Sequence, residues 1–231
     1  MGDTILNSYT LKVWGDFACF TRPEMKVERV SYDVITPSAA RAVFEAVLWK
    51  PALRWQIVRI EVLRPIRWVN IRRNEVGAVI RTNNITTVMN GGNAALEILI
   101  EDDRQQRAGL FLRDVAYRLH ASLHLRDAGS TGKTHAKFSE MFKRRARKGQ
   151  CFNQPYLGTR EFSCAFALIE QEALEQERRL HPAIAEDREL GWMLYDMDFS
   201  DSENPVPRFF NARMVSGGIT VPGRDSEAIR G

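Results

Sequence analysis

The residues with the clearest chemical potential lie in one basic stretch, residues 133–148, which holds seven lysines and arginines against a single acid, Glu140. The stretch offers six candidate contacts to a polyanion: Lys133, Lys143, Arg144, Arg145, Arg147 and Lys148. Clustered cations favour a nucleic-acid partner, because they neutralise backbone phosphates without reading sequence. A solvated charged face is the alternative that charge alone leaves open.

Two side chains in this stretch have the chemistry to act on a phosphodiester. Histidine changes its protonation near neutral pH, so His135 is a candidate general acid or base. Lys137 precedes the apolar residue Phe138 and lies beside the buried stripe of a predicted helix, where a fixed cation could stabilise charge on a transferring phosphate. A solvated histidine at a helix start and an ordinary surface lysine are the alternatives.

A second group of cations lies between residues 54 and 81, with seven arginines against Glu61 and Glu75. The candidates there for holding RNA are Arg67, Arg72, Arg73 and Arg81. Beyond the basic stretch, Arg160 is a further candidate cation. The aromatic rings of Phe152 and Tyr156 could stack on bases, and packing against a sheet is the equal alternative.

Several functions find no support in the sequence. Cys19, Cys151 and Cys164 are widely spaced, which favours neither a disulfide framework nor a zinc site. His120 and His124 lie four apart on a predicted strand, ~13 Å by strand rise, too far to share a metal. We interpret them as surface or core-edge histidines, and we expect no metal and no cofactor.

The chain also lacks the marks of a membrane protein. It contains no run of 18 apolar residues, and its first nine residues are polar, without a signal-peptide pattern. We therefore expect a cytoplasmic protein with no membrane partner.

Apolar spacing predicts four segments in the first half of the chain. They are a strand, a helix ending before Pro51, a second strand, and a long loop or extended hairpin, over residues 9–17, 37–50, 55–63 and 65–93. Thr36 is expected to cap the helix, and Gly15-Asp16 to break the first strand. Val58, Ile60 and Val62 are expected to share one face of the second strand. Trp49 and Trp55 are expected in the core.

The second half begins with the clearest strand pattern, residues 114–126. A helix is predicted over residues 134–148, with Gly149 as its C-cap. The remaining predictions are a charged surface insertion over residues 170–190 and strands over residues 158–167, 192–199, 209–216 and 219–221. Gly217-Gly218 predicts a two-residue hairpin turn between the last two strands.

This order of elements predicts an α+β fold. Residues 1–168 fit a ferredoxin-like, RRM-type domain with two helices on one face of its sheet, and the other face is expected to be open to single-stranded RNA. Residues 169–231 are expected to form a small antiparallel β-sheet extension.

Several stretches resemble one known family. They are Trp14-Gly15-Asp16-Phe17-Ala18-Cys19-Phe20-Thr21-Arg22-Pro23, Val30-Ser31-Tyr32-Asp33-Val34, Thr36-Pro37-Ser38-Ala39, Ala46-Val47-Leu48-Trp49-Lys50-Pro51, Arg113-Asp114-Val115-Ala116-Tyr117, Lys148-Gly149-Gln150-Cys151-Phe152 and Pro155-Tyr156-Leu157-Gly158-Thr159-Arg160-Glu161-Phe162. Over essentially its whole length, the chain resembles the type I-C (Dvulg subtype) form of the Cas-five family of CRISPR-associated proteins.

The resemblance implies a function and a set of partners. It implies an endoribonuclease that cuts precursor CRISPR RNA at the base of the repeat hairpin without a metal, by attack of a ribose 2′-OH, and leaves a 2′,3′-cyclic phosphate. The protein would then stay on the RNA handle with the other subunits of the type I-C interference complex.

The family's catalytic set is a tyrosine, a lysine and a histidine, which fall here on Leu48, Lys137 and Phe138, with His135 as the nearest histidine. Two other hypotheses therefore remain open. One is a non-catalytic subunit that binds the CRISPR RNA handle and also double-stranded DNA. The other is a general RRM-like nucleic-acid binder.

Overall fold

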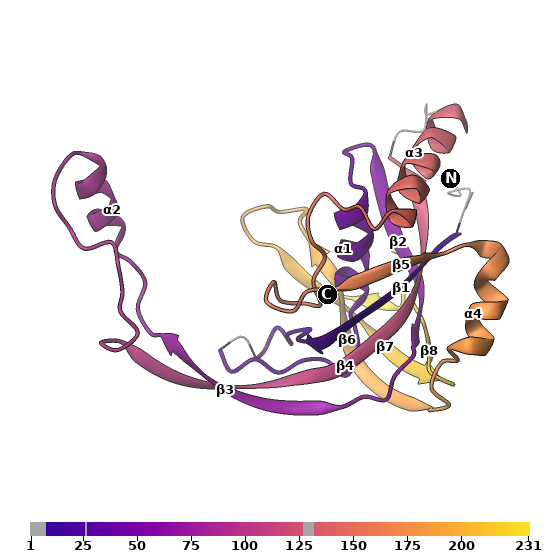
Figure 1. The fold of residues 1–231 in the computed structure, drawn as a ribbon, viewed down its shortest axis with the longest axis horizontal. Coiled ribbons are helices and arrows are strands. Elements are labelled where there is room, and N and C mark those ends of the chain that lie inside the picture. The colour runs from indigo at the N-terminus through magenta and orange to yellow at the C-terminus, as the bar shows by residue number, and fades with distance from the viewer. Residues whose placement is uncertain (1–7, 26, 127–131) are drawn as a thin grey trace.

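The computed structural model describes residues 8–25, 27–126 and 132–231, with only the backbone described for residues 132–134. The strands are β1 (Ser8–Ala18), β2 (Leu53–Val62), β3 (Trp68–Val76), β4 (Arg104–Leu125), β5 (Ala165–Ile169), β6 (Arg188–Asp198), β7 (Val206–Val215), β8 (Gly218–Thr220) and β9 (Ile229–Arg230). The helices are α1 (Pro37–Val47), α2 (Thr82–Met89), α3 (Gly132–Arg147) and α4 (Leu174–Leu180), with a 3-10 turn, η1 (Gln171–Ala173), before α4. The result is a mixed α/β protein dominated by its sheet (Figure 1).

The strands form one antiparallel sheet in the order β5-β1-β4-β2-β8-β7-β6. Two strands lie off this path, because β3 pairs with the first half of β4 and β9 pairs with β7. The short strand β8 joins the halves, since it pairs with β2 on one side and β7 on the other. The C-terminal strands therefore continue the sheet that the N-terminal strands begin.

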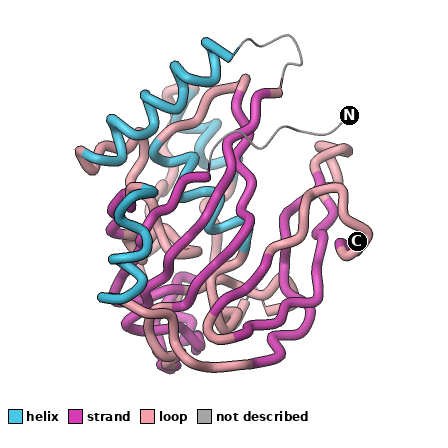
Figure 2. The backbone as a smooth tube through the Cα atoms, turned by 90° about the vertical axis from the view of Figure 1, so that its right-hand side faces the viewer, coloured by secondary structure: helices cyan, strands magenta, loops and turns pink. Residues whose placement is uncertain are grey.

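Helices α1 and α3 cover one face of the N-terminal strands (Figure 2). Four aromatic side chains meet there, Tyr9, Phe44, Trp55 and Phe142, with ring centroids 4.6–5.8 Å apart. These edge-on, tilted and stacked ring contacts add to the energy of apolar burial. This cluster fixes α3 against the sheet and thereby sets which face of α3 meets solvent.

Local signals determine where α1 begins and where α3 ends. The Thr36 hydroxyl accepts a hydrogen bond from Ala39 N at 3.3 Å, as an N-cap should. At the end of α3, Gly149 has a φ of 62°, and the amides of Gly149 and Gln150 donate back to the carbonyls of Ala146 and Arg145. These two bonds form a Schellman motif, and the predicted caps are confirmed.

The opposite face of the sheet is not open, contrary to the expectation for an RRM-type sheet. Helix α4 lies against it (Figure 2), and Arg118 donates from the sheet to the carbonyls of Glu177 and His181. Lys12 adds an ion pair of 2.8 Å to Glu177. The predicted charged insertion thus supplies a cover for the sheet, because buried polar groups on β1, β2 and β4 hold it there.

His120 and His124 are buried on this covered face, so their assignment as surface or core-edge residues was wrong. His120 Nδ1 lies 3.0 Å from the Thr10 hydroxyl, and His124 Nε2 lies 2.8 Å from the Ser122 hydroxyl. Both rings therefore have polar partners inside the protein, as buried imidazoles require.

The arginine-rich stretch over residues 65–93 forms one side of a long arm. Strand β3 pairs with β4 from Trp68–Leu112 to Val76–Arg104, and the arm carries α2 near its tip, away from the body (Figure 1). The extended-hairpin alternative is confirmed. No residue of α2 is buried, and Asn84 donates from this helix to the Ala95 carbonyl of the same arm at 3.1 Å.

Other local predictions need correction. Strand β1 runs through Gly15-Asp16 because a loop packs onto Gly15, where a Cβ atom would lie 2.6 Å from Leu157 Cδ1. In β2 the pairing shifts between Ile57 and Arg59, which removes Val58 from the face shared by Ile60 and Val62.

Two further boundaries differ in the C-terminal half. Strand β5 spans Ala165–Ile169 and overlaps only the end of the predicted 158–167, because the preceding residues form the loop that packs onto β1. The final hairpin turns at Ser216-Gly217, one residue early, since Gly218 already pairs with Val215. Trp55 is buried as expected, whereas Trp49 is exposed.

Candidate nucleic-acid interface

One face of α3 presents the basic stretch to solvent. A shallow depression there is lined by Lys137, Glu140, Met141, Arg144, Arg147 and Lys148. These positions recur at three- and four-residue intervals, so they share one side of the helix. The predicted cationic surface therefore exists as a continuous strip about three turns long.

The opposite side of α3 faces the core. It buries His135, Ser139, Phe142 and Ala146, and only 7% of His135 is exposed. His135 Nε2 has no hydrogen-bond partner within the described residues. Residues two positions apart in a helix point about 200° away from each other around the helix axis, so Lys137 and His135 project to opposite sides. The structure does not bring these two predicted catalytic residues together.

The cations of α3 differ in availability. Arg145 donates to the Val47 carbonyl at 3.0 Å and so ties α3 to α1. Lys143 lies 3.7 Å from Glu140, and Arg147 lies 2.6 Å from Glu170, whose hydrogen bond and charge raise the pKa of Arg147.

Three other cations of this face, Lys137, Arg144 and Lys148, have no ion-pair partner among the residues that the structure describes. They are therefore free to meet phosphate. Lys133 lies in the first turn of α3, where side chains are outside the described part of the chain.

An aromatic groove adjoins the end of α3. Trp49, Phe152 and Tyr156 line a hollow of about 270 Å³, with exposures of 55%, 80% and 39%. The loop is held there because Phe152 N donates to the Ala46 carbonyl at 2.7 Å. Exposed rings beside cations are suited to stacking on unpaired bases. Sequence reasoning selected Tyr156 but assigned Trp49 to the core, although the adjoining Lys50-Pro51 marks a chain that has just left a helix.

The arginines of the arm form a separate group. Arg67 lies 3.5 Å from Asp114, and Arg73 lies 2.7 Å from Glu161 and stacks over the Phe111 ring. Arg72, Arg81 and Arg160 are exposed, without an ion pair to a described residue. The arm thus offers fewer free cations than the sequence predicts, because two of its arginines bind acids of the protein itself.

The positions expected for the family's tyrosine and histidine lie away from solvent. Leu48 is fully buried, and its carbonyl accepts a bond from the Trp55 indole at 2.9 Å. Phe138 is partly buried and packs on the core. Lys137 alone of the three positions is exposed.

Together, the α/β fold, the cationic strip and the neighbouring exposed rings define the surface of a nucleic-acid-binding protein. Within the described residues, no helix is long and apolar enough to cross a membrane.

Comparison with known proteins identifies the family. Residues 8–222 match the family model described as CRISPR-associated protein (Cas_Cas5). A relative from Mannheimia succiniciproducens is 48% identical over 97% of this chain and 99% of its own length, and one from Thermus thermophilus is 40% identical over 92% and 90%. Both are named CRISPR pre-crRNA endoribonuclease Cas5d. This chain belongs to the Cas5d family of CRISPR-associated proteins.

The fold has a counterpart among solved structures. A structure described as a CRISPR-associated protein superposes with a TM-score of 0.67 at 20% identity, with full coverage of both chains. The likeness extends over both halves of the sheet.

Proposed function

We propose that this protein is an endoribonuclease that cleaves precursor CRISPR RNA at the base of the repeat hairpin and remains on the product. The observation that carries the proposal is the 48% identity, over nearly the whole of both chains, to a relative named CRISPR pre-crRNA endoribonuclease Cas5d. The cationic strip on α3 supplies the surface that such a substrate needs, since RNA backbones bind through phosphate contacts.

The proposed cleavage needs no metal. The ribose 2′-OH attacks the adjacent phosphorus, the bond from phosphorus to the 5′-oxygen breaks, and the proton passes from the 2′-oxygen to the leaving oxygen. The products are a 2′,3′-cyclic phosphate and a 5′-hydroxyl. Lys137 stabilises the extra negative charge on the five-coordinate phosphate, which is the part of the reaction that a fixed cation accelerates.

The acid–base role predicted for His135 stays a prediction, and the geometry weighs against it. Its ring is turned into the core, away from the face that carries Lys137. A buried imidazole that cannot reach the scissile phosphate cannot exchange a proton with it. In this proposal His135 packs α3 onto the sheet, and catalysis depends on orientation of the 2′-OH together with Lys137.

A non-catalytic handle-binding subunit, with double-stranded DNA as a further partner, is the second candidate. It is favoured by one observation: the positions of the family's tyrosine and histidine are Leu48 and Phe138, with apolar side chains turned toward the core. In that case Lys137, Arg144 and Lys148 would still bind phosphates.

One assay separates the two candidates. Purified protein is mixed with end-labelled repeat RNA in EDTA, and products are resolved beside a ladder that distinguishes cyclic phosphate ends. A single cut at the hairpin base that Lys137→Ala slows about 10²- to 10³-fold supports the endoribonuclease. Lys148→Ala, on the same helix face, is the comparison: it should weaken binding but leave the rate of the bound complex unchanged. Tight binding with no product establishes the non-catalytic subunit instead.

We also propose that the N-terminal part is a ferredoxin-like, RRM-type unit with its boundary near residue 168. The spatial order β5-β1-β4-β2 supports this, with α1 following the first of these strands in the chain and α3 the third. The C-terminal strands would then be an extension that lengthens the same sheet.

Partner subunits of an interference complex are the last part of the proposal. The arm supports it, because α2 and its flanks expose apolar side chains far from the core, among them Val79 and Met89. Apolar side chains gathered on a protruding element favour contact with another protein.

A further inference from the structure

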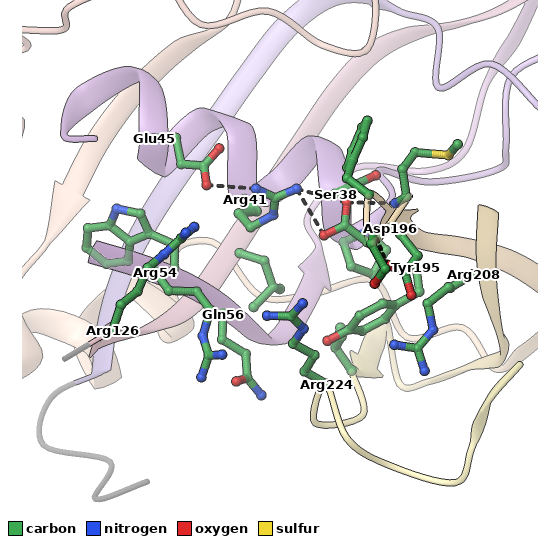
Figure 3. Close-up of a pocket in the computed structure, with 18 residues that line it drawn as sticks. Ser38, Arg41, Glu45, Arg54, Gln56, Arg126, Tyr195, Asp196, Arg208 and Arg224 are labelled. Atoms are coloured by element: carbon green, nitrogen blue, oxygen red, sulfur yellow. Dashed lines mark hydrogen bonds and ion pairs between the residues drawn. The ribbon is translucent and has the colours of Figure 1, made fainter. Parts of the chain in front are cut away.

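A second cationic site lies away from the α3 face, in a cleft between the two halves of the sheet. The cleft has a volume of about 440 Å³, and its walls come from α1, β2, the end of β6, β7 and the segment after β8 (Figure 3). It exists because β8 pairs with β2 only over Arg59–Glu61. The last bond between these segments runs from Val221 N to the Val58 carbonyl, so the first half of β2 has a free edge facing the cleft.

Five arginines line this cleft: Arg41, Arg54, Arg126, Arg208 and Arg224. Arg41 is committed to the protein, because it lies 2.7 Å from Glu45 and 2.9 Å from Asp196 and so ties α1 to β6 (Figure 3). Burial alone would lower the pKa of Arg41, but the two carboxylates raise it above the ordinary arginine value. The ion pair between Arg41 and Asp196 holds the α1 wall of the cleft to the β6 wall.

Three of the remaining cations are uncommitted. Arg126, Arg208 and Arg224 make no ion pair with any described residue, although all three reach the cleft. Three acids also line the cleft: Arg41 holds Glu45 and Asp196, and Asp198 accepts hydrogen bonds from the Ser200 amide and hydroxyl at 2.9 and 2.6 Å. These hydrogen bonds, and the charges of Arg208 and Arg224 at longer range, lower the pKa of Asp198. The cleft therefore keeps an excess of positive charge, with planar forks suited to phosphate oxygens.

The cleft also has groups for a base. Phe199 is 65% exposed among the lining residues, which leaves a ring face available for stacking. The Gln56 amide carries both donors and an acceptor into the same space, and burial raises the pKa of the Tyr195 phenol, which keeps it a neutral donor. A volume near 440 Å³ is in the range of pockets that hold one small ligand.

A route connects this cleft with the α3 face. Glu45 on α1 lines both the cleft and the aromatic groove of Trp49, Phe152 and Tyr156, so the two hollows meet at α1. Phe152, which lines the groove, lies four residues after Lys148 in the chain, so the groove begins close to the end of α3. An RNA strand that leaves a hairpin on α3 can therefore cross the aromatic groove and reach the cleft.

We propose that this cleft binds an unpaired nucleotide of the single-stranded RNA that flanks the hairpin, with Arg126, Arg208 and Arg224 on its phosphates and Phe199 against its base. The inference rests on the proposed function for the identity of the RNA. It adds a binding site that is separate from the cleavage face and selects for unpaired RNA, because a duplex does not fit a pocket of one-nucleotide size.

Binding measurements with three RNAs test this site: the repeat hairpin with its flank, the hairpin without it, and a short unstructured oligoribonucleotide. The variants are Arg126→Gln, Arg208→Gln, Arg224→Gln and the triple. Arg213→Gln is the matched control, since it lies on the same strand as Arg208 but pairs with Glu189 at 3.0 Å outside the cleft. Adenosine monophosphate is a competitor that distinguishes a free-nucleotide site from an RNA site.

Each single variant should weaken binding of the flanked hairpin and the oligonucleotide about tenfold, the size of one lost charged hydrogen bond. The triple variant should bind the flanked hairpin no better than the bare hairpin, with a salt slope smaller by about 0.7 per lost contact. Binding of the bare hairpin, and all binding by Arg213→Gln, should match the wild type. A 4-thiouridine placed in the flank should crosslink to residues 195–200.

The proposal is overturned if the triple variant binds the flanked hairpin and the oligonucleotide as the wild type does, or if the crosslink maps elsewhere. Competition by adenosine monophosphate at micromolar concentration would replace it with a free-nucleotide site. Failure of the proposed function gives a different result, because the wild type would then neither cut the repeat hairpin nor prefer it over other RNA. Binding of the oligonucleotide by the wild type and the triple variant would still test the cleft.

Discussion

The buried charge cluster under α4 makes a quantitative prediction about stability. Arg118 is fully buried, and its closest acid is Glu61, which is itself 4% exposed. Glu61 also lies 3.0 Å from Arg178 and 3.4 Å from His120 Nε2. Replacing Glu61 by Gln leaves the Arg118 guanidinium in the interior without a counter-charge, and breaking a buried pair in this way costs about 3–5 kcal/mol.

For a chain of this length, each kcal/mol corresponds to about 2–4 °C in Tm, so Glu61→Gln should lower Tm by about 6–20 °C. Urea and thermal unfolding at pH 7 measure the change. Glu189→Gln is the control, because it breaks an exposed pair with Arg213 and should cost less than about 1 kcal/mol. Since Arg118 also holds the carbonyls of Glu177 and His181, amide exchange in α4 should accelerate in Glu61→Gln alone.

The same cluster sets a pH dependence. Burial by itself raises the pKa of Glu61, but the His120 and Arg118 side chains lower it well below its usual range. A carboxylate with a depressed pKa in the folded state adds its full share to the free energy of unfolding when the pH is above its unfolded pKa, about 4.3. This stabilisation is lost progressively as the pH falls below that value. The difference in free energy of unfolding between wild type and Glu61→Gln should therefore be constant from pH 7 to 5 and become smaller toward pH 3. The reasoning is refuted if Glu61→Gln and Glu189→Gln lose equal amounts of unfolding free energy. It is also refuted if the difference between wild type and Glu61→Gln does not change with pH.

Four further substitutions give distinct readouts. Lys137→Ala should slow cleavage of repeat RNA about 10²- to 10³-fold in single-turnover assays while binding changes little, and an unchanged rate would remove Lys137 from catalysis. His135→Asn should lower Tm but leave the pH–rate profile in place, whereas loss of a limb of that profile would restore its predicted acid–base role. Leu48→Tyr should destabilise the protein by about 1–3 kcal/mol in urea, because the larger ring must enter a filled core, and a gain in cleavage rate would contradict that account. Gly149→Ala should cost about 1–2 kcal/mol at the Schellman turn, and a neutral result would mean that the positive φ is not needed.

Much of the local structure follows from the sequence. The Thr36-Pro37 start of α1, the alternation over residues 114–126 and the Gly149 end of α3 are set by neighbours within a few residues. The basic strip on α3 is of the same kind, because helical periodicity alone places Lys137, Arg144 and Lys148 on one side.

Tertiary packing decided what the periodicity left open. His135 and Lys137 are neighbours in sequence, yet the aromatic cluster around Phe142 determines which of them faces the core. The second face of the sheet is closed because α4 and the residue after it carry the Glu177 and His181 carbonyls that Arg118 needs, although α4 begins 49 residues after β4 ends. A pattern of spacing says which residues share a face, but it carries no information about which distant segment will cover that face.

The cleft is the clearest case of this limit. Its uncommitted arginines come from positions 126, 208 and 224, which no local motif connects. They meet because β8 pairs with β2 over only three residues and then diverges, so the site is created by where a strand pairing ends. The sequence by itself determined helices α1 and α3, most strands and the cationic strip, but it did not predict α2 or α4. The long-range pairing of strands determined this second site.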